Sequence, residues 1–171
     1  AWFDYPKAAK TYEELLLIAR SQLDTVNEVF YLEKLAFIYE QSLQPENALR
    51  IKQEMLDNYL QTQQLEAIPK LKVEIGDEYL ALEELETASQ TYQEAFTLAW
   101  GLQQLSVAGD ALEKLGDLYL ENNHDEYALQ IYKELLKIQQ QSYDFYGLMT
   151  TYDQIAKIYL DAENYSQALT A

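Results

Sequence analysis

The sequence predicts an all-α protein built from repeated helix hairpins, and three observations support this prediction. The chain matches itself after a shift of forty residues, without insertion or deletion. Within each period, apolar residues recur every three or four positions, as one face of a helix requires. The 171 residues include five Gly and three Pro, which suits helices joined by short turns.

Three columns of residues carry the forty-residue period. The aromatic column consists of Tyr39, Tyr79, Tyr119 and Tyr159. The column of small residues consists of Ala36, Gly76, Gly116 and Ala156. The alanine column consists of Ala8, Ala48, Ala88, Ala128 and Ala168. Because the columns keep one phase along the chain, each period is a copy of the same structural unit.

Each period contains two helices separated by a polar turn such as 121–125. We expect first helices over residues 25–42, 65–82, 105–121 and 145–161. We expect second helices over residues 5–21, 46–62, 86–102 and 125–141, and from 164 onward. The chain therefore reads as one array of repeats that starts and stops inside a repeat, which suggests a fragment of a longer protein. Its parts are residues 1–24 (the second helix of a preceding repeat), 25–64, 65–104, 105–144 and 145–171 (a truncated fourth repeat).

The three columns have a physical reason. The small residues are expected where the first helix crosses the second helix of its own hairpin, because a large side chain there would push the helices apart. The tyrosine rings are expected to fill the gap between successive hairpins, with their hydroxyl groups at a polar rim. One hairpin cannot bury its apolar face alone, so stacking of hairpins creates the core.

Composition excludes several classes of function. The chain has 29 Asp plus Glu against 12 Lys plus Arg, a net charge of −17, which argues against binding to nucleic acid or to anionic lipid. It has no cysteine and one histidine, which leaves no disulfide, thiolate metal site or His-rich zinc site. No apolar run approaches the length of a membrane span. We expect a non-catalytic protein without cofactor or metal. We expect it in the cytoplasm, and the absence of cysteine is also compatible with the periplasm.

The repeats resemble the tetratricopeptide repeat. The signature places of that family are filled in order by Leu112, Leu115, Gly116, Tyr119, Ala128, Tyr132 and Leu135. The forty-residue period is similar to that of kinesin light chains and of bacterial sensor and regulator arrays. The resemblance implies a right-handed α-solenoid of antiparallel helix hairpins (a TPR superhelix) that binds a protein or peptide as a scaffold or adaptor.

The sequence departs from the family pattern at three places. The tryptophan place holds Leu32, Lys72, Leu112 and Tyr152. The proline that usually ends the second helix is absent. The usual turn glycine is replaced by Leu43, Glu83, Asn123 and Glu163, of which only Asn accepts a left-handed backbone easily.

The resemblance also implies a partner-binding groove on the concave surface, lined by the first helices. Of its twenty positions, nine are acidic and four are basic. This favours a basic or mixed basic-apolar partner segment, with Phe37 and Val73 as apolar anchors. The alternative is an ordinary solvated face on an acidic protein. The candidate groove residues are Glu33, Phe37, Lys70, Val73, Glu74, Asp77, Asp110, Glu113, Lys114, Asp117, Asp153 and Lys157.

A co-chaperone role is disfavoured. Relatives that grip the carboxylate tails of heat-shock chaperones use Lys, Asn and Arg at five of these places. Here the same places hold Glu33, Phe37, Glu74, Asp110 and Lys114, and only Lys114 has the required charge. An acidic tail would be repelled.

Other features stay open at this stage. His124 is a turn residue that could be a ligand or a pH sensor but is more simply an exposed side chain. Asp110, Glu113 and Asp117 share a helix face without the loop that a calcium site needs. The glutamines that include Gln139, Gln140 and Gln141 are expected to solvate the ends of second helices.

Two further functions remain alternatives to a scaffold. One is a regulatory input array that controls an effector outside this fragment. The other is a self-assembling array, a weak homo-oligomer through array ends that expose Ile155, Ile158 and Leu169.

Overall fold

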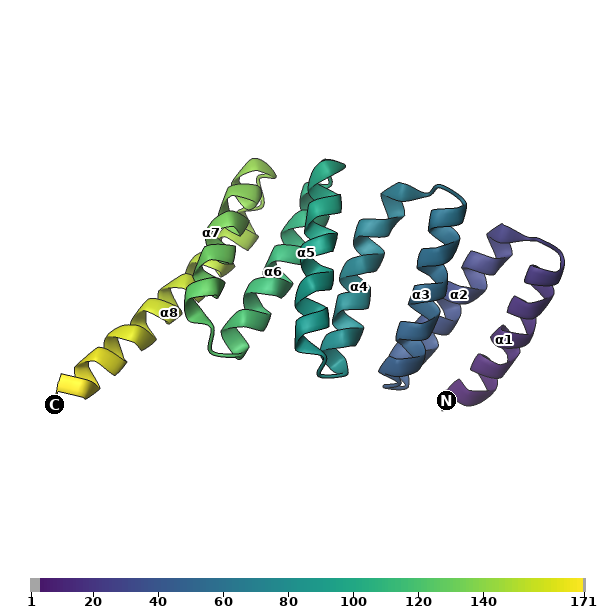
Figure 1. Cartoon of the computed structure of the whole chain (residues 1–171), viewed down its shortest axis with the longest axis horizontal. Helices are drawn as coiled ribbons and strands as arrows, with labels where there is room; N and C mark the ends of the chain where they lie inside the picture. Colours follow the sequence, from purple (N-terminus) through teal and green to yellow (C-terminus); the bar gives the residue numbers. More distant parts are fainter. Residues whose placement is uncertain (1–3, 171) are drawn as a thin grey trace. The chain divides into compact units, whose positions relative to one another are not determined.

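The computed structural model describes residues 4–170, with side chains described as far as Glu163. This part of the chain holds eight α-helices, one 3-10 turn and no strand. Within each of the two units described below, successive helices run antiparallel (Figure 1). The helices are α1 (Tyr5–Ser21), α2 (Thr25–Gln41), α3 (Pro45–Gln61), η1 (Leu65–Ala67), α4 (Ile68–Ala81), α5 (Leu85–Gly101), α6 (Leu105–Glu121), α7 (Asp125–Gln141) and α8 (Phe145–Thr170). The predicted first helices are α2, α4, α6 and α8, and the second helices are α1, α3, α5 and α7, so the hairpin prediction is confirmed.

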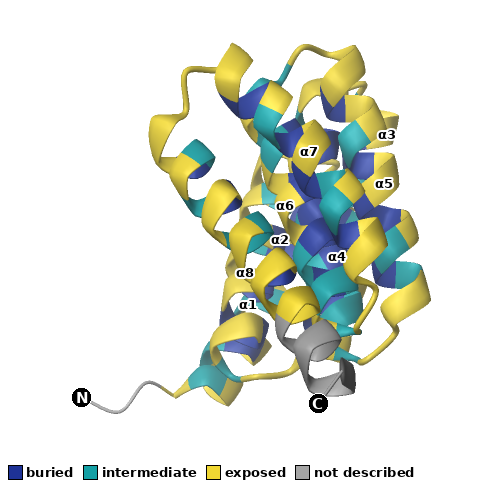
Figure 2. Cartoon of the chain, turned by 90° about the vertical axis from the view of Figure 1, so that its left-hand side faces the viewer, coloured by how far each residue is buried: buried dark blue, intermediate teal, exposed yellow. Residues whose placement is uncertain are grey.

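The chain divides into two compact units, Ala1–Thr91 and Tyr92–Ala171, with the boundary inside α5. In the first unit, α1, α2, α3 and α4 pack in chain order and bury Leu32, Leu35 and Ile51 completely. In the second unit, α6, α7 and α8 pack in the same way around Leu115, Tyr132 and Leu135. Figure 2 shows the buried residues on helix faces that meet other helices, and exposed residues on the opposite faces.

Turns recur every twenty residues with one geometry. The second of the three residues that join successive helices has a positive φ between 54° and 61°, and none of these residues is glycine: Leu23, Leu43, Gln63, Glu83, Gln103, Asn123 and Tyr143. The N–H of the following residue donates to the carbonyl five residues earlier, as in Gln44 N–H to Tyr39 O at 2.9 Å and His124 N–H to Tyr119 O at 2.9 Å. This hydrogen bond satisfies a carbonyl that the helix end would leave unpaired. The left-handed turn is therefore kept although its usual glycine is absent.

Three tyrosines of the column, Tyr39, Tyr79 and Tyr119, lie as the sequence predicts, with their hydroxyl groups at a polar rim. The Tyr39 hydroxyl donates to Glu13 Oε1 at 2.6 Å, and the Gln53 amide donates to the Tyr79 hydroxyl at 3.1 Å. In the second unit the Gln93 amide donates to the Tyr119 hydroxyl at 3.4 Å. Each tyrosine thus bonds to the residue 26 positions earlier, on the preceding second helix. The hydroxyl groups fix the register between successive hairpins.

The small residue at position 116 is required by the ring opposite it. A Cβ added to Gly116 would lie 2.6 Å from a ring carbon of Tyr132, much closer than carbon atoms approach in proteins. This confirms the predicted helix crossing between α6 and α7. In the first repeat the same two columns hold Ala36 and Lys52. The Lys52 side chain is narrower than a tyrosine ring, so the methyl group of Ala36 has room.

Two predictions about helix ends are wrong. The first helix of the second repeat does not start as an α-helix at residue 65: Leu65–Ala67 is a 3-10 turn, and α4 begins at Ile68. Pro69 explains this, because proline has no N–H to give to an α-helical hydrogen bond and disfavours the α conformation before it.

The predicted turn between 161 and 164 is also absent, because α8 continues through it to Thr170. Asp161, Ala162 and Glu163 include no glycine or proline, so the local sequence does not break the helix there. Consequently Ala156 and Tyr159 are exposed instead of packed in their columns. The predicted places of Ala168 and Leu169 lie outside the described side chains.

Candidate functional site

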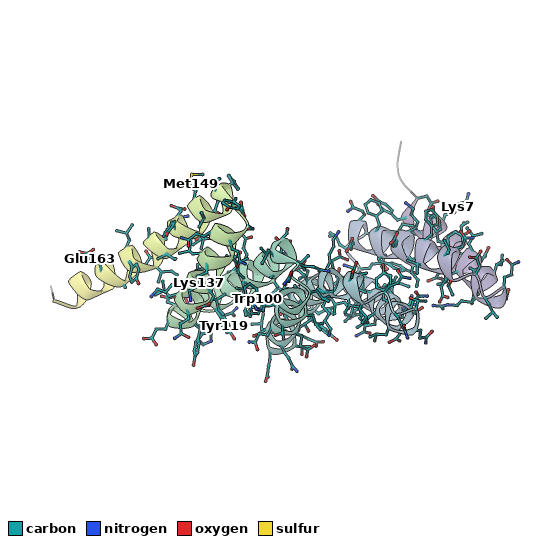
Figure 3. The ribbon with its side chains drawn as sticks, turned by 90° about the horizontal axis from the view of Figure 1, so that it is seen from above. Lys7, Trp100, Tyr119, Lys137, Met149 and Glu163 are labelled. Carbon is teal, nitrogen blue, oxygen red and sulfur yellow. The ribbon has the colours of Figure 1, made fainter. Side chains whose placement is uncertain are left out.

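The candidate site is the exposed face of the first helices, which we call the helix-A face and describe in each unit separately. In the first unit, Glu33 and Phe37 on α2 and Lys70 on α4 are exposed, while Glu74 and Asp77 are partly buried. Figure 3 gives the side chains along the ribbon.

Val73 does not lie on this surface. Its side chain is 7% exposed, so the expectation that Val73 is a surface anchor is wrong and Val73 belongs to the packed interior.

Phe37 lines an opening in the surface of the first unit. It is 56% exposed and lies at the rim of an opening of about 280 Å³ between α1 and α2. Tyr5, Tyr12 and Ile38 supply most of the apolar wall, and Lys34 and Asp4 lie at its edge. Beside it, the Lys34 ammonium lies 5.1 Å from the centre of the Phe30 ring, a cation–π distance.

A buried lysine lies beneath the helix-A face of the first unit. Lys52 on α3 is 2% exposed and forms ion pairs with Glu40 on α2 and with Glu78 on α4, the second at 2.7 Å. Burial alone would lower the pKa of Lys52, but the two carboxylates outweigh it and raise this pKa. Lys52 therefore joins two successive first helices through the second helix between them.

Glu74 lies near this cluster, and its pKa is shifted by the surroundings. Its pKa is raised, first by partial burial and then by the negative charges of Glu40 and Asp77, against the opposing effect of Lys52 and Lys70. The charged form of Glu74 is thus held in an unfavourable environment at neutral pH.

In the second unit, three of the predicted residues already have partners within the chain. The Tyr132 hydroxyl donates to Asp117 Oδ1 at 2.6 Å, which gives Asp117 a structural role. Asp153 and Lys157 form an exposed ion pair at 2.6 Å, one turn apart on α8. Such a pair contributes little free energy and leaves both side chains accessible.

Asp110, Glu113 and Lys114 are exposed on α6. The pKa of Glu113 is raised, first by partial loss of water and then by the charges of Asp117, Asp110 and Asp144, while Lys114 acts in the opposite direction. Neighbouring carboxylates therefore disfavour the charged form of Glu113.

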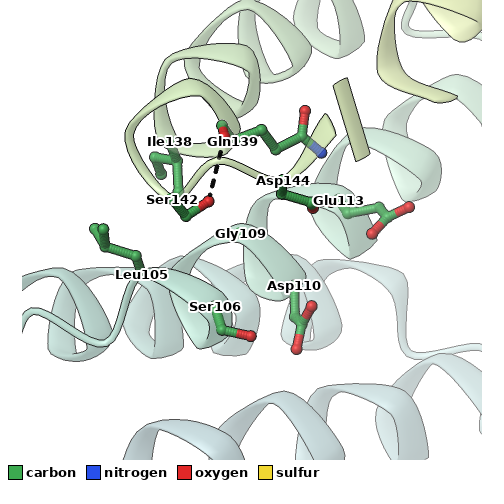
Figure 4. Close-up of a pocket in the computed structure, with 9 residues that line it drawn as sticks. All are labelled: Leu105, Ser106, Gly109, Asp110, Glu113, Ile138, Gln139, Ser142 and Asp144. Atoms are coloured by element: carbon green, nitrogen blue, oxygen red, sulfur yellow. Dashed lines mark hydrogen bonds between the residues drawn. The ribbon is translucent and has the colours of Figure 1, made fainter. Parts of the chain in front are cut away.

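Asp110 and Glu113 also line a pocket of about 210 Å³ between α6, the end of α7 and the start of α8 (Figure 4). Its remaining lining residues are Leu105, Ser106, Gly109, Ile138, Gln139, Ser142 and Asp144. The lining contains three carboxylates, one amide, two hydroxyl groups and no basic side chain.

Gln139 and Asp144 were not among the predicted site residues. Gln139 is 4% exposed, so its expected role of solvating a helix end is wrong. A signal was present, because Gln139 stands in a column otherwise held by Ala19, Tyr59 and Ala99, all buried. Asp144 accepts the Gly147 N–H at 2.9 Å and so caps the N-terminus of α8.

Nothing in the described part of the chain supports a metal site or a membrane span. No group of three or more potential ligands occurs among the described residues, Asp110, Glu113 and Asp117 included. Within that same part, no helix is long and apolar enough to cross a bilayer. His124 lies in the turn before α7 and packs edge-on against the rings of Tyr119 and Tyr127.

The antiparallel hairpins, the forty-residue period and the left-handed turns define an α-solenoid of the tetratricopeptide-like type. No model of a known protein family matches the chain, and no curated protein matches it. The chain is similar to a solved protein of Podosopora anserina described as a kinesin light chain with nearly identical TPR-like repeats. That structure has a TM-score of 0.73 and 14% identity, over 97% of this chain and 82% of that one.

Two other solved structures are similar. BtubC (BKLC) from P. vanneervenii has a TM-score of 0.72 and 14% identity, over 94% of this chain and 68% of that one. MamA has a TM-score of 0.57 and 18% identity, over 96% of this chain and 92% of that one. At these identities the similarity establishes the fold alone, that of an all-α helical repeat protein.

Proposed function

We propose that the chain is a non-catalytic scaffold whose helix-A face binds a basic or basic-apolar segment of a partner protein. The observation that carries this proposal is the set of carboxylates on this face: Glu33, Asp110 and Glu113 are exposed, and Glu74 and Asp77 are partly exposed. Partial burial raises the pKa of Glu74, and partial burial together with neighbouring carboxylates raises the pKa of Glu113, so the charged forms of both carry a free-energy cost. A cationic partner would remove that cost, whereas an ordinary solvated face would not carry it.

The apolar part of the proposed partner segment is supported in the first unit. Phe37 and the opening beside it lie on the same helix as Glu33. In a segment that alternates basic and apolar residues, the basic side chains could contact Glu33 and the apolar side chains could contact Phe37, within one unit. Association with such a segment is expected to weaken as salt increases, because exposed charges are screened.

The experiment is an affinity capture from native lysate at low and at high salt with three proteins. One is the parent chain, and the second reverses three exposed charges of the helix-A face, Glu33→Lys, Asp110→Lys and Glu113→Lys. Asp117 is left unchanged because it accepts the Tyr132 hydroxyl. The third is a matched control that reverses three exposed charges on second helices, Glu14→Lys, Asp57→Lys and Glu126→Lys.

A protein captured by the parent and the control but lost with the helix-A variant supports the proposal, especially when its captured segment is basic. Equal loss with both variants reduces the effect to net charge and contradicts it.

A second candidate function, self-association through α8, is favoured by one observation. The expectation that Ile155 and Ile158 are exposed is wrong, because Ile158 is in the core and Ile155 packs against it. Other apolar side chains of α8 are exposed instead: Phe145, Met149, Tyr152 and Tyr159. Figure 3 shows Met149 pointing away from the ribbon. Light scattering over a concentration series tests this candidate, and a constant monomer mass contradicts it.

A further inference from the structure

The exposed side of α8 carries a regular apolar stripe. Phe145, Met149, Tyr152, Ala156 and Tyr159 follow one another at spacings of four, three, four and three residues, and all five are exposed. We call these five residues the α8 stripe. Its spacing averages 3.5 residues, which is the repeat of a helix that packs lengthwise along another helix.

The same five places on α6 belong to a face that packs against a helix. They are all buried or partly buried, and they hold Leu105, Gly109, Leu112, Gly116 and Tyr119. A Cβ at Gly116 would meet Tyr132 of α7, and a Cβ at Gly109 would meet Leu135 and Ile138 of α7. On α8 the turn that would lead into such a second helix is absent, because α8 continues to Thr170 (Figure 1). The stripe is therefore a helix-packing face that the described part of the chain leaves exposed.

The α8 stripe is complementary to itself when two α8 helices pair in antiparallel directions. With a two-fold axis beside Tyr152, the Tyr152 rings of the two copies lie against each other. Met149 then faces Ala156 of the second copy, so a long side chain meets a short one, and Phe145 faces Tyr159 of the second copy. A parallel pair would instead set the two Ala156 residues opposite each other and leave a gap in the seam.

The charge of this segment favours a second copy of the chain over a basic partner. Residues 145–160 contain one acidic and one basic residue, Asp153 and Lys157, which pair with each other at 2.6 Å. The segment therefore has no net charge, within a chain whose net charge is −17. Two copies can meet here without the repulsion that opposes contact between their acidic surfaces. A cationic segment would gain no such electrostatic attraction as the helix-A face offers.

We propose that two copies of the chain dimerise through the α8 stripe, as an antiparallel helix pair with Tyr152 at the two-fold axis. The inference rests on the second candidate function, self-association through α8, and adds the occupant of the stripe and the register of the pair. Because the stripe spans only two heptads, we expect a weak dimer with a dissociation constant on the order of micromolar or above. A two-fold contact closes on itself, so we expect no species larger than a dimer.

The first measurement is light scattering on the whole chain at concentrations from micromolar to millimolar. The mass of the parent should rise from monomer to dimer and then level off. Tyr152→Lys places two ammonium groups opposite each other and should weaken the dimer about tenfold or more. The matched control, Tyr127→Lys, makes the same exchange at an exposed tyrosine of α7 and should leave the dissociation constant within about twofold.

The second measurement tests the register by single-cysteine variants under mild oxidation, since the chain has no cysteine of its own. Tyr152→Cys brings two thiols together at the axis and should give a disulfide-linked dimer. Phe145→Cys should not, because its two copies would lie about 21 Å apart along the helix pair, which is too far for a disulfide. A mixture of Phe145→Cys and Tyr159→Cys should restore the cross-link, between the two different chains.

The outcomes separate this inference from the functions proposed above. A constant monomer mass would overturn both the inference and self-association through α8. A dimer that Tyr152→Lys leaves intact, or a mass that keeps growing with concentration, would overturn the inference alone and assign self-association to another surface. Equal cross-linking of Phe145→Cys and Tyr152→Cys would contradict the antiparallel register. The helix-A face is tested independently, by the capture of a basic segment.

Discussion

Lys52 is the residue on which the contact between three helices of the first unit depends most. It occupies the column that holds Tyr132 in the third repeat, and it replaces an aromatic ring with an ion pair to Glu40 and Glu78. The sequence could not reveal this exchange, because neither glutamate stands near Lys52 along the chain. Only the packing of α3 between α2 and α4 brings them together.

We expect Lys52→Met to lower the free energy of unfolding by about 3 kcal/mol, because it leaves the buried Glu78 without a partner. The double variant Lys52→Met with Glu78→Leu should recover most of that loss, since no buried charge remains. Urea unfolding followed by circular dichroism measures both. A Lys52→Met variant as stable as the parent would contradict a stabilising role for the ion pairs of Lys52 with Glu40 and Glu78.

Glu113 gives a pH dependence with a definite sign. Its pKa in the folded chain is raised above the value in the unfolded chain, so the charged form destabilises the fold above that pKa. As pH falls from neutral through the raised pKa, Glu113 takes up a proton and its unfavourable contribution disappears.

The Glu113→Gln variant should therefore melt at a higher temperature than the parent at neutral pH, and the difference should close as pH falls through the raised pKa and below the ordinary pKa of a glutamate. Melting curves over this pH range test the sign, with Glu126→Gln as the control for loss of one charge. A Glu113→Gln variant that is less stable than the parent at neutral pH would show that the sign is wrong.

At the scale of a helix, α6 carries two glycines with opposite roles. Gly116 faces the Tyr132 ring, whereas a Cβ at Gly109 would meet Leu135 and Ile138 at ordinary contact distances. The repeat pattern predicted the first of these roles, because position 116 belongs to the column of small residues. It could not assign the second, because Gly109 lies outside every column.

Gly109→Ala should stabilise the protein by about 1 kcal/mol, since alanine is the better helix former and its methyl group fits. Gly116→Ala should destabilise it by about 1–2 kcal/mol, because the clash with Tyr132 exceeds the gain in helix propensity. Thermal unfolding of the two variants compares them directly. Similar shifts of one sign would contradict the assigned crossing of α6 and α7.

The turns show where local sequence fails as a guide. Leu43 is 87% exposed with a φ of 54°, a conformation that leucine adopts at a cost. The repeat predicted a turn at this place, but the residue type gave no reason to expect a left-handed backbone. The hydrogen bond from Gln44 N–H to Tyr39 O and the packing of α3 on α2 impose it.

Leu43→Gly should raise the free energy of unfolding by about 0.5–1 kcal/mol, because glycine removes the strain of the positive φ. Leu43→Ala is the matched control, since alanine shortens the side chain but retains that strain. Both are measured by chemical denaturation. A gain with alanine equal to that with glycine would assign the effect to the exposed leucine side chain instead.

At the scale of the whole chain, the forty-residue period of the sequence predicts the fold but says much less about the function. Helix bounds follow from columns that repeat every forty residues, and the structure moves them by a residue or two except at Pro69 and at the end of α8. The candidate site was less predictable. Gln139 and Asp144 enter it because the end of α7 and the start of α8 meet α6, a relation that the repeat columns do not encode.

The central claim is that the helix-A face, and not the net charge of −17 alone, selects a basic partner segment. The most direct test is binding of the parent and both triple charge-reversal variants to arrayed peptides of basic, neutral and acidic composition, at low and high salt. The claim predicts that the parent and the second-helix control bind basic-apolar peptides at low salt and that the helix-A variant loses them. Equal binding by both variants, or a preference of the parent for acidic peptides, would contradict it.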